Sequence, residues 1–100
     1  MVKHIVIWNL KDEYQDEQKL DQAQKMKDEL EALPDFIEGI LSLKVYANPL
    51  PSSSGDVILV SAFVDQEALT AYQIHPEHRR VAEFIHTVAK ERKCMDYIEI

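Results

Sequence analysis

The chain has 100 residues, of which 46% are apolar and 29% are charged, and its formal net charge at pH 7 is −7. A chain of this length forms one domain with a modest core, so we expect a single domain over residues 1–100. The acidic balance without a basic stripe argues against a nucleic-acid partner, and no apolar run approaches the roughly 18 residues of a membrane span.

The first predicted element is a strand over residues 2–10, "VKHIVIWNL", which is rich in β-branched and aromatic residues. A charge and a histidine interrupt the apolar residues of this segment, so it does not have the continuous apolar region of a signal peptide. The single cysteine, Cys94, cannot form an internal disulfide, which suits a reducing compartment. We therefore expect a cytoplasmic protein.

A helix is predicted next, with Asp16 as its N-cap and Pro34 at its end, because a residue before proline avoids the helical region. The inward face of this helix is apolar at steps of three or four residues. Its members are Leu20, Ala23, Met26, Leu30 and Leu33.

Two strands are predicted over residues 40–48 and 57–64, on either side of the loop "PLPSSSGD". Asp65 then caps a helix that Pro76 interrupts, and after a second helical piece the last strand covers residues 94–100. The order β-α-β-β-α-β predicts a ferredoxin-like α+β fold, with a four-stranded antiparallel sheet and the helices on one face.

Two of these strands, 2–10 and 57–64, are apolar on both faces, whereas a half-solvated sheet should alternate apolar with polar residues. The face turned away from the helices would carry Ile5, Ile7, Ile58, Val60 and Val64. Left open, this patch would exceed what a monomer usually exposes, and each side chain contributes about 1.5–3 kcal/mol when buried. We expect a homodimer formed through this open face; loops or the C-terminal tail are the alternative cover.

The stretch "LTAYQIHPEHRR" holds the candidate chemistry. Pro76 suits the first turn of a helix, which places His75 at the cap and His78 within that turn. Val81, Ile85 and Val88 follow His78 at helical spacing, so His78 should face inward.

Tyr72 follows Leu69 by three residues and should face inward as well. The break at Pro76 lets these two inward faces converge. His4 shares a strand face with Val6 and Trp8, so His4 is a third candidate for the same interior.

Burial and the positive end of a helix both disfavour a charged imidazole, so His78 should be neutral at pH 7 and able to act as a base. A buried Tyr72 hydroxyl needs a partner, which an imidazole nitrogen would supply, and together they would form a proton-transfer pair. The alternative is a structural hydrogen bond that fixes the helix break.

No metal site is expected, because His75 and His78 lack a third ligand. Cys94 is predicted to be a small core residue, and His86 to be solvated.

Four stretches, "VKHIVIWNLK", "SSGDVILVSAF", "LTAYQIHPEHRRVAEFI" and "CMDYIEI", together resemble the stress-responsive α/β-barrel (Dabb) domain family over essentially the whole chain. The specific parts are the Lys-His start and the "Y..HP.H" segment. The resemblance implies a ferredoxin-like unit that pairs into a dimeric α/β barrel. Its polyketide-cyclase branch implies Tyr72 as the carbonyl-polarising acid, His78 as the general base and His4 in a pocket between sheet and helices.

The pocket implied by this resemblance is mostly apolar. Its expected lining residues are Val6, Trp8, Ala23, Met26, Val57, Leu59 and His75. Val57 and Met26 stand where the cyclases carry a histidine and a tyrosine, and Trp8 would occupy much of the cavity. These departures argue against a long polyketide substrate.

Three functions follow as expectations. The first is a cofactor-independent enzyme that acts on a small carbonyl or polyketide-like compound by Tyr/His acid-base chemistry. The second is a non-catalytic stress-response protein or a dimer that binds a small apolar or aromatic ligand. The third is a cofactor-free monooxygenase, because related dimeric barrels include such enzymes.

Overall fold

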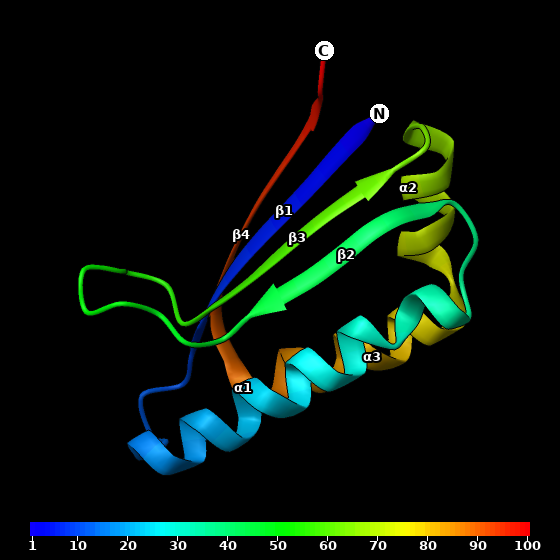
Figure 1. The fold of residues 1–100 in the computed structure, drawn as a ribbon. Helices are drawn as coiled ribbons and strands as arrows, with labels where there is room; N and C mark the ends of the chain where they lie inside the picture. The colour runs from blue at the N-terminus through cyan, green and yellow to red at the C-terminus, as the bar shows by residue number, and fades with distance from the viewer.

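The computed structural model describes residues 1–100 and has four strands in one antiparallel sheet, with every helix on the same side of it (Figure 1). The elements in chain order are β1 (Val2–Leu10), α1 (Asp16–Glu31), the 3-10 helix η1 (Leu33–Asp35), β2 (Ile40–Tyr46), β3 (Val57–Phe63), α2 (Gln66–Ile74), α3 (Pro76–Val88) and β4 (Ala89–Ile98). The strand order β2-β3-β1-β4 confirms the predicted ferredoxin-like α+β fold. None of the helices has the length and apolar character that crossing a bilayer requires.

The predicted strands end one or two residues beyond β2, β3 and β4, and two other boundaries also differ. The N-cap of α1 is Gln15, whose backbone N–H donates to the Gln18 side chain, so Asp16 is the first helical residue rather than the cap. The last strand begins at Ala89 instead of residue 94, because β4 pairs with almost the full length of β1. Leu20, expected on the inward face of α1, is exposed.

The core lies between the sheet and the helices. Its largest fully buried members include Phe63 of β3, Met26 of α1 and Leu33 of η1. On β1, alternate residues from Val2 to Leu10 are buried against the helices, as the alternation rule for strands requires. His4 is one of these alternate residues, so the fold carries a polar side chain into the core layer.

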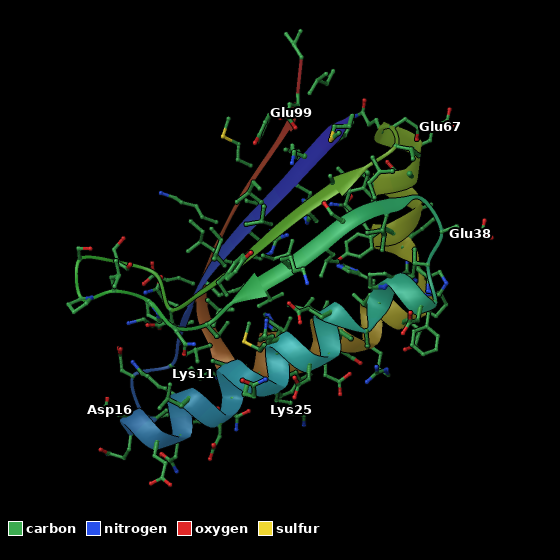
Figure 2. The ribbon with its side chains drawn as sticks, viewed as in Figure 1. Lys11, Asp16, Lys25, Glu38, Glu67 and Glu99 are labelled. Atoms are coloured by element: carbon green, nitrogen blue, oxygen red, sulfur yellow. The ribbon has the colours of Figure 1, made fainter.

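The opposite face of the sheet has no helix over it, and side chains project from it into open space (Figure 2). Six of its apolar side chains come from three adjacent strands: Ile5, Ile7, Ile58, Val60, Met95 and Tyr97. We call these six residues the open face. Met95 is 66% exposed and Tyr97 41% exposed, so the strands are apolar on both sides, as predicted, and one chain leaves the second side uncovered.

Candidate functional site

The break between α2 and α3 positions the site. His75 has an extended backbone, with φ −64° and ψ 137°, and it is both the C-cap of α2 and the N-cap of α3. Its Nδ1 accepts a hydrogen bond of 3.1 Å from the backbone N–H of Glu77. The expected capping role of His75 is therefore present, and its side chain is directed to the helix start rather than into a pocket.

His78 lies in the first turn of α3 and faces α2. Its Nδ1 is 3.1 Å from the backbone carbonyl oxygen of Gln73. A carbonyl only accepts hydrogen bonds, so Nδ1 carries the hydrogen and donates it, and Nε2 keeps a free lone pair. Burial lowers the pKa of His78 below its ordinary 6.5; the hydrogen bond to Gln73 opposes this, and the positive charge of nearby Arg92 adds to it. His78 is therefore neutral at pH 7 and has one basic nitrogen available.

Tyr72 of α2 is only 1% exposed. Its ring packs on the His78 ring, with 4.4 Å between centroids and 55° between planes, and on Phe63 of β3 at 4.9 Å. The expected hydrogen bond between the Tyr72 hydroxyl and His78 is not formed; the two rings contact each other at a tilt instead. The side chain of Tyr72 makes no hydrogen bond to any other group of the chain.

The Tyr72 hydroxyl is nevertheless not sealed in the core. No fully buried side-chain nitrogen or oxygen lacks a hydrogen-bond partner, so the partnerless hydroxyl must reach open space, and Tyr72 lines a cavity. Burial raises the pKa of Tyr72 well above its ordinary value, against a smaller opposing effect of Arg92. The phenol therefore stays protonated at neutral pH and can donate a hydrogen bond to a ligand.

His4 is held by two strands at once. Its backbone carbonyl accepts a hydrogen bond of 2.7 Å from the Ser61 hydroxyl of β3, and its Nδ1 lies 2.5 Å from Oδ1 of Asp96 on β4. The carboxylate accepts the Nδ1 hydrogen, which fixes the orientation of the ring. The His4 ring meets the Tyr72 ring edge-on at 6.1 Å, so a carboxylate–imidazole pair stands beside the Tyr72–His78 pair.

These three side chains share a cavity of about 460 Å³ between the inner face of the sheet and the helices α2 and α3. This volume lies in the range of small-molecule pockets. Val6, Trp8 and Leu59 form part of its wall, as expected. Trp8 is 5% exposed and packs in that wall, so it does not fill the space.

The other expected pocket residues lie elsewhere. Ala23, Met26 and Val57 are buried in the core and do not line the cavity. Leu30 is the residue of α1 that reaches it, one turn beyond Met26. The register explains Val57, because it pairs with Trp8 near the end of β1, away from His4.

Several residues of the site were not foreseen from the sequence. Arg92 of β4 lines the cavity, and Asp96 holds His4 from outside the cavity lining; both come to the inner face because the register pairs them with Trp8 and His4. His86 is exposed, as expected, yet it lines the cavity mouth. Asp96 and Arg92 have no local signal in the sequence, because the pairing of β1 with β4 joins opposite ends of the chain.

Cys94 differs from its expected role as a core residue. It is exposed, because β4 is an edge strand with no neighbour beyond it. Partial burial raises the pKa of the Cys94 thiol, and the hydrogen bond to Asp96 acts in the same direction. The thiol is therefore less nucleophilic than an ordinary cysteine at neutral pH.

His4, Cys94 and Asp96 offer a nitrogen, a sulfur and an oxygen that all lie within 4.8 Å of one another. These are donor types that zinc accepts. Two donors bound to one tetrahedral ion stand roughly 3.3 Å apart, whereas Nδ1 of His4 and Oδ1 of Asp96 are 2.5 Å apart. The geometry is therefore that of a hydrogen-bonded pair with a thiol beside it.

The chain is similar to a known protein family and to solved structures. The sequence model of the family described as "Stress responsive A/B Barrel Domain" matches residues 2–99. No curated protein matches the chain significantly. A crystal structure of a dimeric protein of unknown function with a ferredoxin-like fold, from Bacteroides fragilis, is 33% identical, with a TM-score of 0.91 over 98% of this chain and 95% of that one.

Two more distant structures show the same fold. The hydroxynitrile lyase from Passiflora edulis is 14% identical, with a TM-score of 0.82 over 99% of this chain and 93% of the lyase. A putative antibiotic biosynthesis monooxygenase from Nitrosomonas europaea is 13% identical, with a TM-score of 0.78 over 100% of this chain and 99% of that protein. At these identities the likeness concerns the fold alone.

Proposed function

The chain belongs to the stress-responsive A/B barrel domain family, and we propose that it is a cofactor-independent enzyme that moves a proton on a small carbonyl compound. One observation carries the proposal: a neutral imidazole with a free Nε2 and a phenol hydroxyl without an internal partner share a cavity of about 460 Å³. A purely structural pair would satisfy its own polar groups, whereas this pair leaves a donor and an acceptor for a ligand.

The proposed step is proton abstraction from the carbon next to the carbonyl. Nε2 of His78 takes the proton, the electron pair of the C–H bond forms the C=C bond of an enolate, and the carbonyl oxygen gains negative charge. The Tyr72 hydroxyl donates a hydrogen bond to that oxygen. His4, held by Asp96, orients the carbonyl compound. The return of a proton from His78 to the carbon completes the cycle without an oxidant or a metal.

The test is deuterium exchange. A panel of small ketones and oxo acids is incubated in D2O with the protein, and NMR follows hydrogen loss at the carbon next to the carbonyl. We expect exchange above the buffer rate with the wild type and its loss in His78→Gln. His75→Asn is the matched control, because it also removes an imidazole but keeps a good N-cap.

Three results would contradict the proposal in different ways. Saturable binding of these compounds without exchange would favour the non-catalytic ligand-binding function. Exchange that persists in His78→Gln would assign the base to another residue. A product that has gained an oxygen atom, formed without any cofactor, would favour the monooxygenase function instead.

We also propose that the protein forms a homodimer through the open face. The support is the uncovered apolar surface of three adjacent strands together with the dimeric state of the Bacteroides fragilis relative. A face of this kind usually marks an interface. The cavity lies on the other side of the sheet, so dimer formation leaves Tyr72 and His78 accessible.

We propose the cytoplasm as the location of the protein. Cys94 is an exposed thiol without a disulfide partner, which a reducing compartment preserves. Fractionation of cells, with an antibody against the protein, would test this location; recovery in an oxidising compartment would contradict it.

A further inference from the structure

Arg92 is a cation without an ion-pair partner at the wall of the cavity. It lies on β4 opposite Trp8, and so on the inner face of the sheet. None of the ion pairs of the chain includes it; Arg80, by contrast, contacts both Glu29 and Glu77. The charge of Arg92 partly opposes the rise that burial causes in the pKa of Tyr72 and adds to the lowering of the pKa of His78, so the guanidinium acts on both groups of the proposed catalytic pair.

The charge around the cavity has the opposite sign to that of the chain, which carries a net −7. Lys90 and Arg92 line the cavity, and Glu91 is the acidic residue among its lining. Glu91 pairs with Asn9, so strand alternation directs its side chain to the other face of the sheet. Lys90 is already paired with Asp12 at 2.7 Å. Arg92 is therefore the cation that is free for a ligand.

Arg92 is exposed on the edge strand β4, and its unpaired guanidinium at the cavity wall favours one class of partner. Its planar fork donates two parallel hydrogen bonds to a carboxylate, which adds orientation to charge attraction. The polar groups of the cavity would then divide their roles: Arg92 holds an anionic end, while Tyr72 and His78 meet a neutral carbonyl and its neighbouring carbon.

We propose that the substrate is a small oxo acid whose carboxylate is bound by Arg92. This inference rests on the proposed proton transfer and names the class of compound on which it acts. The carboxylate fixes the molecule at the β4 side of the cavity, and the apolar wall of Val6, Trp8 and Leu59 accommodates a short aliphatic or aromatic tail.

The experiment compares two probes of the same shape. α-Ketoisocaproate and methyl isobutyl ketone differ only in a carboxylate against a methyl group on the carbonyl carbon. Their dissociation constants are measured by NMR titration, and their deuterium exchange is measured in the same samples. With the wild type we expect the oxo acid to bind at least about tenfold more tightly than the ketone, because each hydrogen bond to a charged group contributes strongly.

Arg92→Gln should abolish that preference and leave the ketone affinity unchanged. Arg79→Gln is the matched control, because Arg79 is an exposed arginine on α3 that does not line this cavity, and it should keep the preference. Arg92→Lys, which keeps the charge but loses the fork, should retain part of it and serves if Arg92→Gln does not fold. An equal affinity of wild type and Arg92→Gln for the oxo acid overturns the inference, as does an equal loss in Arg79→Gln.

The two proposals fail separately. Exchange of both probes without an Arg92-dependent preference overturns the oxo-acid inference and leaves the proton transfer intact. An absence of exchange with every probe overturns the proton transfer, whatever the affinities are.

Discussion

Tyr72 is unusual among buried tyrosines, because its hydroxyl has no hydrogen-bond partner within the chain and opens into the cavity. Tyr72→Phe removes only that hydroxyl and keeps the ring packing on Phe63 and His78. The free energy of unfolding should therefore change by less than about 1 kcal/mol, while loss of an oxyanion donor should lower kcat by about 10²–10³.

Thermal denaturation and the exchange rate, measured on the same preparation of Tyr72→Phe, check this prediction. A large drop in melting temperature would mean that the hydroxyl has a structural partner after all. Unchanged exchange would mean that it plays no part in the reaction.

The second prediction at this scale concerns pH. Burial and neighbouring positive charge lower the pKa of His78 below 6.5, so the base is neutral at pH 7 and becomes protonated only in more acidic solution. The rate of exchange should therefore be flat around pH 7 and fall on the acid side, with a midpoint below pH 6.5.

A pH–rate profile of kcat/KM measures this midpoint, and a midpoint above the ordinary histidine value would contradict the described environment. NMR titration of the imidazole carbon-bound hydrogens, with His78→Gln as the assignment reference, should give the same midpoint.

Some residues of the site are predictable from local spacing. The inward direction of Tyr72 and His78 follows from the positions of Leu69 and Val81, and the cap at His75 follows from Pro76. Asp96 was not predictable, because its contact with His4 depends on the pairing of two strands from opposite ends of the chain. The free hydroxyl of Tyr72 was also missed, because spacing shows which faces converge but not whether rings stack or hydrogen-bond.

At the scale of elements, the turn into β2 depends on Gly39. Its φ of +88° lies in the region that favours glycine, and a Cβ there would come within 2.7 Å of the Cβ of Ala68 on α2. Gly39 also accepts the hydrogen bond from the N–H of Val64. This single residue therefore lets the start of β2 approach α2 closely.

Gly39→Ala should lower the free energy of unfolding by about 2 kcal/mol or more, because backbone strain and the clash with Ala68 both act against it. Urea denaturation measures the loss. Gly55→Ala is not a suitable control, because its new Cβ would contact Ile7. Ala32→Gly, at the C-cap of α1, is the control for the effect of exchanging glycine and alanine on the free energy of unfolding where no clash arises. A Gly39→Ala variant as stable as the wild type would contradict the described turn.

Element types were well predicted because their signals are local: alternation in β1, helical spacing in α1 and the break at Pro76. The start of β4 at Ala89 was missed, because Lys90 to Lys93 form a charged run with no strand pattern of their own. Pairing with β1, rather than the propensity of these residues, makes this segment a strand.

At the scale of the whole molecule, the two faces of the sheet differ. The helices lie over the inner face only (Figure 1). The inner face carries His4 and part of the cavity wall, and the open face is apolar. Its apolar character was readable from the sequence because both parities of β1 and β3 are apolar. The contribution of Met95 and Tyr97 required the register of β4.

If the proposed homodimer forms through the open face, Val60→Asp should convert it to a monomer. Val60 pairs with Ile5 and Lys44 in the middle of the sheet, so a carboxylate there would have to be buried without a partner on dimer formation. Sedimentation velocity at micromolar concentration measures the change. Ile74→Asp is the matched control, because Ile74 is an exposed apolar residue on α2, and it should stay dimeric. A monomeric wild type would contradict the assignment of the open face.

The proposal that Tyr72 and His78 act together in one proton transfer is tested most directly by a double-mutant cycle on the exchange reaction. The cycle compares the wild type, Tyr72→Phe, His78→Gln and the double variant. Groups that act in one proton transfer are strongly non-additive. If both groups act in one step, the double variant exchanges hydrogen no more slowly than His78→Gln alone. Independent losses that multiply, or four proteins with the same rate, would contradict it.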